Sequence, residues 1–362
     1  MKHLYLLSVI AFVTICSSCG SSQSNSSSRL EAPERQGWNE QRPLFGDVES
    51  VTITYYWLDD KFGEIVRDSI YRLQKYYFNE EGDVIKSNWF NSMNKYTYDS
   101  ARNITEEAQY RPDGSLAWKE IYKYDSAGNR TEVAHYKSDG SLYWKGVYKY
   151  DSARNRNEEA YYFLDGSLAW KEINKYDSAG NKTEAARYDS DGSLGGKTVY
   201  KYDSAGNKTE EAQYSSGFMS VWLPMLIYEY NSTENRIEWN SDVSLSWKSI
   251  YKYDSRGNMI EETYYDSDDS LAWKEINKYD SVGNRTEVAR YDSDGSLAWK
   301  EINKYDSAGN RTEAALYDSD GSLNGKYTYK YDSRGNMIEE TDYSSGALIP
   351  KSQSVVEIVY RN

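Results

Sequence analysis

The stretch KEINKYDSVGNRTEVARYDSDGSLAWKEINKYD, residues 274–306, decides the fold because it begins and ends on the same seven residues. The tyrosine of this Lys-Tyr-Asp motif falls at 98, 124, 150, 176 and 202, and again at 253, 279, 305 and 331, so the step within each run is 26 residues. A fixed period of this length indicates tandem supersecondary units. The units are rich in Tyr, Thr, Ile, Val and Trp and are interrupted by Gly-containing turns, which favours strands over helices.

Each unit contains two turns, of which 306–310 and 292–296 are examples. In both, an Asp starts the turn and a Gly follows three residues later, where a type I turn with a bulge requires a positive φ. Arg102 and Arg154 replace this Gly in two units, and each should cost about 1 kcal/mol unless the following Asn takes the left-handed conformation. Between the turns remain strands of roughly 8 to 10 residues.

Counting outward from the turns predicts the register of the strands. Tyr291 should lie opposite Leu297, and Tyr305 opposite Arg311. Continued without a shift, the same count places Trp299 opposite Ala289 and Tyr317. Alternation along the strands then puts Leu297, Trp299, Tyr291, Tyr305 and Tyr317 on a single aromatic face.

The predicted fold class is therefore all-β, built from tandem 26-residue strand-turn-strand repeats that form a long, twisted antiparallel meander. Sheets beyond ~10 strands curl or fold over because their twist accumulates. We expect the aromatic face to be concave and turned inward as the meander spirals.

The N-terminus is typical of an exported bacterial protein. An apolar stretch at 4–15 is too short to span a membrane permanently and suits a signal peptide. It leads into Cys16-Ser17-Ser18-Cys19, which resembles a bacterial lipobox and makes Cys19 the predicted lipidation site; the alternative is a plain secretory signal with an incidental Cys pair. We expect a lipoprotein signal peptide at 1–18 and a flexible Ser-rich tether at 19–46.

The regular spacing breaks once, around residues 217–243. Tyr230 holds the place of a repeat tyrosine out of register, with two residues inserted before it, so the sequence predicts a structural discontinuity here with Pro224 at a bulge or an edge. The neighbouring Trp222, Leu223 and Met225 could form a docking patch or a locally repacked core. We infer two repeat blocks, 47–230 and 231–362.

Composition limits the partners of the chain. The formal net charge of −14 argues against nucleic acid, since phosphate binding needs a basic surface. There are 37 Tyr and 11 Trp against 7 Phe, which indicates that aromatic rings, more than aliphatic side chains, are buried.

Catalytic and metal-binding patterns are weak in this sequence. His135 occupies a strand position held elsewhere by Arg187 or Arg290, which suggests a surface variant and not a general base. Asp292-x-Asp294 imitates part of a calcium loop, but Arg290 stands where the first ligand should be. The carboxylates recur in every unit, whereas an active site is made once. We expect no catalytic residue, no metal and no cofactor.

Tryptophan is the best candidate for a functional residue. Rings at equivalent positions of successive units could fill the inside of the curl, or they could form a platform on which the faces of sugars stack. The candidate ligand-binding residues are Trp118, Trp144, Trp170, Trp222, Trp273 and Trp299.

The recurrent turn resembles the YD repeats of the RHS family, as 124–129 and 253–260 show. The likeness covers roughly residues 75–342. It implies a β-rich architecture of hairpins, and it suggests carbohydrate binding, because YD repeats have been linked to that activity. Asp-Ser-Ala, at Asp125, Asp177, Asp203 and Asp306, resembles a bacterial O-glycosylation signal.

Together these features predict a non-catalytic lipoprotein of the bacterial cell envelope, a β-repeat binding or scaffold module at the periplasmic or surface face of the outer membrane. Its partners would be the membrane, through the lipid on Cys19, and a glycan or an envelope protein, with no nucleic acid. A carbohydrate-binding protein that uses the row of Trp and Tyr side chains is the alternative, and an envelope glycosidase comes third.

Overall fold

The computed structural model describes residues 35–361, apart from 37, 39–41, 43, 90, 217–242 and 344–349. In this part of the chain all the regular elements are β-strands, which confirms the predicted all-β fold. The strands are β1 (Val48–Lys61), β2 (Glu64–Phe78), β3 (Val84–Trp89), β4 (Ser92–Tyr98), β5 (Ile104–Tyr110), β6 (Leu116–Tyr124), β7 (Arg130–Lys137), β8 (Leu142–Tyr150), β9 (Arg156–Phe163), β10 (Leu168–Tyr176), β11 (Lys182–Asp189), β12 (Leu194–Tyr202), β13 (Lys208–Ser216), β14 (Val243–Tyr253), β15 (Met259–Tyr265), β16 (Leu271–Tyr279), β17 (Arg285–Asp292), β18 (Leu297–Tyr305), β19 (Arg311–Asp318), β20 (Leu323–Tyr331), β21 (Met337–Tyr343) and β22 (Pro350–Tyr360).

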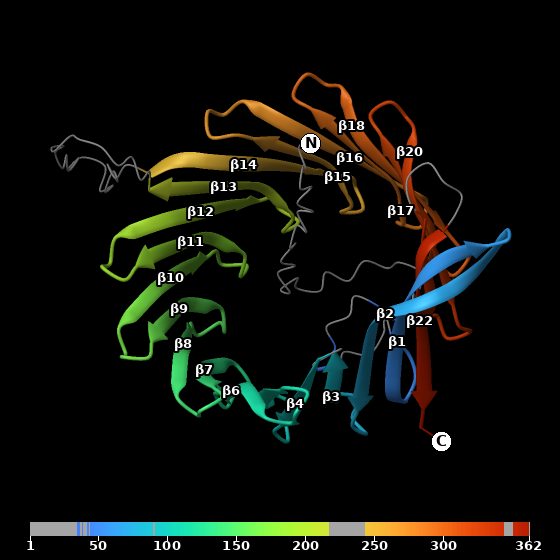
Figure 1. The fold of residues 1–362 in the computed structure, drawn as a ribbon. Coiled ribbons are helices and arrows are strands. Elements are labelled where there is room, and N and C mark those ends of the chain that lie inside the picture. The colour runs from blue at the N-terminus through green and yellow to red at the C-terminus, as the bar shows by residue number, and fades with distance from the viewer. Residues whose placement is uncertain are drawn as a thin grey trace, which may run out of the picture.

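The strands form one antiparallel sheet that closes on itself. Each strand pairs with the strand before it and the strand after it in the chain, and β1 also pairs with β22, for example through Ile53 and Val356. Figure 1 shows the resulting ring. The predicted curl is confirmed, but the meander meets its own beginning and does not spiral. No described residue belongs to a helix long and apolar enough to cross a membrane.

The turns have the expected geometry. Gly309 and Gly295 adopt φ values of 80° and 83°. The carboxylate of Asp306 accepts hydrogen bonds from the backbone N–H groups of Ala308 and Asn310, both at 2.9 Å. In the two units without the Gly, Arg102 and Arg154 themselves take the left-handed conformation, with φ of 66° and 68°. The strain therefore falls on the Arg and is not passed to the following Asn.

The repeat tyrosines link successive units. The hydroxyl of Tyr305 donates a hydrogen bond to the backbone carbonyl of Arg285, at 2.9 Å, on the neighbouring strand. Tyr279 makes the same bond to Met259, also at 2.9 Å. Tyrosine recurs every 26 residues because the ring and the hydroxyl together tie each unit to the preceding one.

The predicted register is right beside the turns and wrong in the middle of the strands. Tyr291 pairs with Leu297 and Tyr305 with Arg311, but one-residue bulges follow, and Trp299 lies opposite Arg290 and Asp318. A shift of one residue moves a side chain to the other face of the sheet. Tyr291 pairs with Lys274, on the face opposite to Trp299, so the single aromatic face was a wrong prediction.

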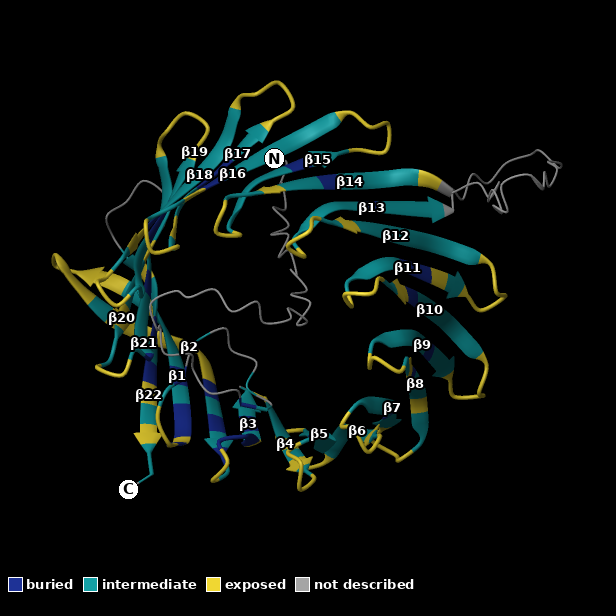
Figure 2. Cartoon of the chain, turned by 180° about the vertical axis from the view of Figure 1, so that it is seen from behind, coloured by how far each residue is buried: buried dark blue, intermediate teal, exposed yellow. Residues whose placement is uncertain are grey.

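The segment before β1 identifies the inner face. Leu44 joins a buried cluster with Val51, Ile53 and Tyr76, and this segment lies on the inner side of the ring. Figure 2 shows that buried residues are concentrated on β1, β2 and β22. Leu44 and Arg35 are both buried, and both fall inside the range predicted as tether.

The same inner face carries the tryptophans. Ser354, two residues from Val356 and on the same face, lies opposite Glu340, which lies opposite Tyr329. On the face of Tyr329, Gly325 lies opposite Leu316, and Leu316 lies opposite Glu301, two residues from Trp299. The outer face carries ion pairs and cation–π contacts, such as Lys304 with Glu313 at 2.8 Å and Lys300 over the ring of Tyr317 at 5.7 Å.

The sheet continues across the irregular part of the sequence. β13 pairs with β14 from Glu210 opposite Ile250 to Ser216 opposite Val243. Tyr253 donates to the carbonyl of Lys208 at 2.9 Å, so the tyrosine linkage also continues. The predicted discontinuity, with Pro224 and the patch around Trp222, lies outside the described residues except for Val243, and so does the boundary between the two predicted blocks.

Candidate functional site

The candidate tryptophans lie on the inner face, each six residues before the tyrosine of its unit. The structure brings Trp118, Trp144 and Trp170 into one row and places Trp273 and Trp299 in a second. All of these rings are partly buried. Trp222 lies outside the described residues.

Trp247 is a member of the second row that was not among the candidate ligand-binding residues. It stands six residues before Tyr253, as the other tryptophans stand before their tyrosines, and its indole N–H donates to Gln213 at 2.6 Å. In the first row, Trp118 donates to Gln109 in the same way at 3.0 Å. Counting backward from Tyr253 would have found Trp247, whereas counting forward from the preceding unit selected Trp222.

The first aromatic row crosses β6 to β11. The ring of His135 stacks between Trp118 and Trp144, with centroids at 5.4 Å and 5.5 Å and interplanar angles of 26° and 12°. Tyr161 then stacks against Trp170 at 4.4 Å and 21° and contacts Trp144 at 5.4 Å. The guanidinium of Arg187 closes the row, 4.3 Å from the centroid of Trp170. The first aromatic row is Trp118, His135, Trp144, Tyr161, Trp170 and Arg187.

The second aromatic row crosses β14 to β18. Tyr264 lies between Trp247 and Trp273, at 5.7 Å and 5.2 Å, and is almost parallel to Trp273 with an angle of 2°. Arg290 lies between Trp273 and Trp299, with its guanidinium 3.9 Å and 5.5 Å from the two centroids. The second aromatic row is Trp247, Tyr264, Trp273, Arg290 and Trp299.

Strand geometry explains both rows. Neighbouring strands lie about 5 Å apart, which is close to the stacking distance of aromatic rings. The bulged register sets Trp144, Trp170, Trp273 and Trp299 directly opposite the preceding member of their row. Trp144, Trp170 and Trp273 therefore have a row neighbour on both sides, whereas Trp118, Trp247 and Trp299 have one on a single side.

Glycine separates the two rows. Gly196 takes the Trp position in β12, opposite Arg187. A Cβ at this residue would lie 3.0 Å from the backbone oxygen of Tyr214, so any side chain here would require the neighbouring backbone to shift slightly. Gly325 takes the same position in β20, opposite Leu316.

His135 occupies the position of Arg187 and Arg290, as predicted, but it is not a surface residue. Its ring is held between two tryptophans, and its Nδ1 lies 3.1 Å from the carboxylate of Glu120. The imidazole therefore replaces a guanidinium as the flat, polar member of the row.

Carboxylates face each other on the inner face beside the rows. The directly opposed pairs are Glu107 with Glu120, Glu159 with Glu172, and Glu262 with Glu275. Burial raises the pKa of Glu107, and the charge on Glu120 raises it further. Burial likewise raises the pKa of Glu262 and brings the pKa of Tyr200 and of Tyr329 to about 12. The inner face is thus a crowded, weakly solvated surface.

Neutralising Glu107 should stabilise the protein. We expect Glu107→Gln to raise the free energy of unfolding by roughly 0.2–1 kcal/mol at pH 7, since like charges directly opposite each other on a sheet are destabilising. Because the pKa of Glu107 is raised in the folded protein, the repulsion from Glu120 destabilises the fold fully only above that raised pKa. The gain should therefore vanish as the pH falls below about 4, where Glu also binds a proton in the unfolded chain. Urea denaturation at several pH values measures it.

Glu132 on the outer face is the matched control. Burial alone would raise its pKa, but hydrogen bonds from Lys123 and Lys145, both at 2.9 Å, lower it. The ionised Glu132 side chain therefore stabilises the protein above the pKa of Glu in the unfolded chain, and this stabilisation is lost as the pH falls. Glu132→Gln should therefore destabilise at pH 7, and equal effects of the two substitutions would contradict the assignment of the faces.

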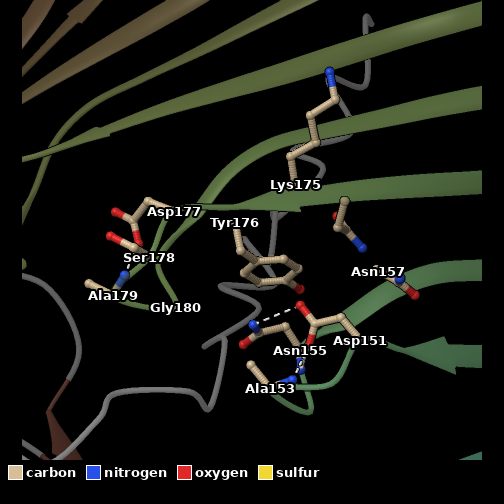
Figure 3. Close-up of a pocket in the computed structure, with 11 residues that line it drawn as sticks. Asp151, Ala153, Asn155, Asn157, Lys175, Tyr176, Asp177, Ser178, Ala179 and Gly180 are labelled. Atoms are coloured by element: carbon tan, nitrogen blue, oxygen red, sulfur yellow. Dashed lines mark hydrogen bonds between the residues drawn. The ribbon is translucent and has the colours of Figure 1, made fainter.

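A surface pocket of about 760 Å³ lies beside the turns that end β8 and β10 (Figure 3). Tyr176 lies between Asn155 and Asn157 on one side and Asp177 on the other. The side-chain oxygens of Asn157 and Asn174 have no hydrogen-bond partner, but both are buried and offer no surface to a ligand. Among the described residues, no cluster of three or more His, Cys, Asp or Glu side chains could hold a metal ion.

No family model and no curated protein matches the sequence. Among solved structures, the chain is similar to the TcdB2-TccC3-Cdc42 complex, with a TM-score of 0.49 and 12% identity over 86% of this chain and 16% of that one. A porin-like protein from Bacteroides uniformis matches 86% of this chain and 98% of its own length, with a TM-score of 0.29 and 8% identity. The chain thus spans about a sixth of the length of the TcdB2-TccC3 chain. At these values the likenesses concern the β-repeat fold and carry no argument about function.

Proposed function

We propose that this protein is a lipid-anchored, non-catalytic scaffold module of the bacterial cell envelope. The observation that carries the proposal is the use made of the aromatic side chains. Trp170 is stacked on Tyr161 on one side and covered by Arg187 on the other, so the residues best suited to binding serve to hold neighbouring strands together. Rigid, repeated contacts of this kind suit a protein whose role is to hold a fixed shape.

The electrostatics of the two faces agree with this role. On the outer face, Lys side chains pair with Glu on the next strand in unit after unit, for example Lys278 with Glu287 at 2.9 Å and Lys175 with Glu184 at 2.8 Å. Single exposed pairs contribute little, but a repeated network of mixed charges keeps a large surface soluble without a sticky apolar patch.

Carbohydrate binding is the second candidate, because the tryptophans of both rows remain partly exposed. Edge contacts with the inner face would use polar neighbours such as Gln109, Gln213 and Arg290. A glycan-array screen of the lipid-free chain tests this candidate. Binding that is lost in Trp273→Ala while the fold persists would favour it over the scaffold.

The lipid anchor rests on the sequence around Cys19, and it has a direct test. Cys19→Ala should abolish the incorporation of radioactive palmitate into the chain in bacterial cells and release the protein from the membrane fraction. Cys16→Ala is the control and should keep the label. Labelling that persists in Cys19→Ala would place the lipid elsewhere or remove the anchor.

A further inference from the structure

The hairpin of β1 and β2 extends beyond the strands on either side of it. β3 ends at Trp89, which lies opposite Gln74, so residues 64–73 of β2 pair with β1 on one side and with no described strand on the other. Figure 1 shows this hairpin in light blue, standing out from the ring. Residues 64–73 therefore form a sheet edge to which another strand can be added.

Apolar side chains are exposed along this edge, which lies outside the regular units. Ile65 pairs with Asp60 and Ile70 with Tyr56, so both isoleucines point to the face opposite to that of the buried Ile53. They are 42% and 52% exposed. The exposed large apolar residues of the hairpin are Trp57, Phe62, Ile65, Ile70, Tyr71 and Leu73. An apolar row beside an unpaired edge favours association with another strand.

Two bulges limit which strand can pair with this edge. The register of β1 against β2 shifts twice, which leaves Asp68 and Tyr71 of β2 without a directly opposed residue on β1. Bulges and charged side chains twist an edge and keep unrelated strands away. A partner strand must therefore carry a matching twist and a complementary order of charges.

The same edge of a second copy meets both requirements. When two β2 strands run antiparallel about a two-fold axis between Arg67 and Asp68, each Arg67 lies opposite the Asp68 of the other copy, and each Ile65 lies opposite an Ile70. Opposite charges and apolar side chains facing each other in this way stabilise a strand pair. A shift of one residue would set either Arg67 or Asp68 opposite itself, so like charges exclude the neighbouring registers.

Both charged side chains are available for such a contact. Arg67 donates to Gln353 at 2.7 Å and lies 3.9 Å from Glu339, but its side chain is still 45% exposed. Asp68 lies 3.4 Å from Lys61, and both of these side chains are about half exposed. Single exposed contacts of this kind contribute little, so they can be exchanged for contacts across the two-fold axis.

We propose that this protein forms a two-fold symmetric dimer in which residues 64–73 of two copies pair as neighbouring antiparallel strands. Each copy contributes the same edge, which is then used up, so the assembly closes at two. A stable interface buries about 800 Å² per partner, more than one strand pair supplies, so the dimer should be weak and concentration-dependent. The inference goes beyond the proposed scaffold role and requires neither the lipid nor a ligand.

The hairpin suits a protein partner better than a membrane. Residues 59–64 at its turn include three acidic side chains and one lysine, whereas segments that lie on membrane surfaces are rich in Lys and Arg on their polar face. The backbone along 64–73 also needs hydrogen-bond partners, which a second strand supplies and lipid tails do not.

Sedimentation of the full chain, produced without lipid and measured at several concentrations, tests the dimer. We expect a monomer–dimer equilibrium with no larger species. Arg67→Asp sets like charges opposite each other and should weaken the association at least about tenfold. Arg67→Asp combined with Asp68→Arg puts opposite charges back in place and should restore the dimer. Circular dichroism shows whether each variant keeps its fold.

Cysteine pairs test the register. With Cys16 and Cys19 replaced by alanine, Ile65→Cys combined with Ile70→Cys should form disulfides between copies. Within one chain the two positions are roughly 15 Å apart along the strand, too far for a disulfide. Val66→Cys combined with Ile70→Cys is the matched control and should not crosslink, because Val66 pairs with Asp59 and so points to the other face.

Several results would overturn the proposal. They are a chain that stays monomeric at every concentration, a dimer that survives Arg67→Asp unchanged, and equal crosslinking by the two cysteine pairs. Binding of the lipid-free chain to vesicles of phosphatidylethanolamine and phosphatidylglycerol, lost in Phe62→Ser, would assign the hairpin to a membrane instead.

Discussion

Trp170→Ala should lower the free energy of unfolding by about 3 kcal/mol, the lower end for truncation of a large aromatic ring, because the edge of Trp170 is still partly exposed. The substitution removes the stacking partner of Tyr161, now at 4.4 Å, and the ring beneath Arg187, now at 4.3 Å. Neither neighbour can move across the gap without leaving its own strand. Urea denaturation followed by circular dichroism measures the loss.

Trp170→Phe is the control for this experiment. A smaller ring in the same position keeps part of the stacking, so the loss should be clearly smaller than that of the alanine variant. If Trp170 were instead part of an open platform for sugars, Trp170→Ala would change stability by no more than about 0.5 kcal/mol, as surface substitutions do. That result would exclude the packing role on which the scaffold proposal depends.

Arg102→Gly should destabilise the protein by about 1–4 kcal/mol. Arg102 donates to both oxygens of Asp83, at 2.8 Å and 2.5 Å, and the Asp83 side chain is fully buried. The Arg102 side chain is itself partly exposed, but the carboxylate that would lose its partner is buried. Leaving a buried charge without its partner costs about 3–5 kcal/mol, from which roughly 1–2 kcal/mol of relieved backbone strain is to be subtracted. The Asp83 carboxylate also accepts from the backbone N–H of Gln36 at 3.0 Å, so the segment before β1 should loosen as well.

Arg154→Gly provides the matched comparison. Arg154 has nearly the same φ as Arg102, 68° against 66°, but its exposed side chain holds no buried carboxylate. We expect this substitution to be neutral or to stabilise by up to about 1 kcal/mol. A similar loss in both variants would mean that the turn conformation, and not the ion pair, sets the effect.

The pH dependence gives an independent check on Asp83. Burial alone would raise its pKa, but the hydrogen bonds from Arg102 and from the backbone of Gln36 outweigh burial and lower it. The pair therefore contributes stability above the unfolded-state pKa of Asp, near 3.9, and loses it as the pH falls. In Arg102→Gly this part of the acid dependence should disappear.

The turns and the fold class could be predicted because they depend on neighbours in the sequence. Gly309 and Asp306 define a turn within five residues, and the 26-residue period repeats it. Counting residues from the turns could not predict the register in the middle of the strands. A bulge adds one residue to one strand, so Trp299 lies opposite Arg290, one residue from the predicted Ala289, and Tyr291 changes face relative to Trp299.

Closure of the ring depends on a contact that the repeat does not encode. The pairing of Ile53 with Val356 joins two strands that lie outside the regular units, and no spacing in the sequence relates them. Trp247, in contrast, stacks on Tyr264 of the following strand, and its spacing of six residues to Tyr253 could have placed it in the row.

The pairing of β1 with β22 has a consequence for the assembly of the chain. Hairpins of neighbouring strands can form as soon as they are synthesised, but the edge of β1 must wait for the last strand to be made, and closing so long a loop costs about 2 kcal/mol more than closing one repeat. Until then both ends of the growing sheet present unpaired backbone to other chains, which is the geometry of edge-to-edge aggregation. A chain without β22 should therefore form an open sheet, and not a smaller ring, with two edges whose unpaired backbone can pair with other chains. The final strand thus protects the edge of the first strand.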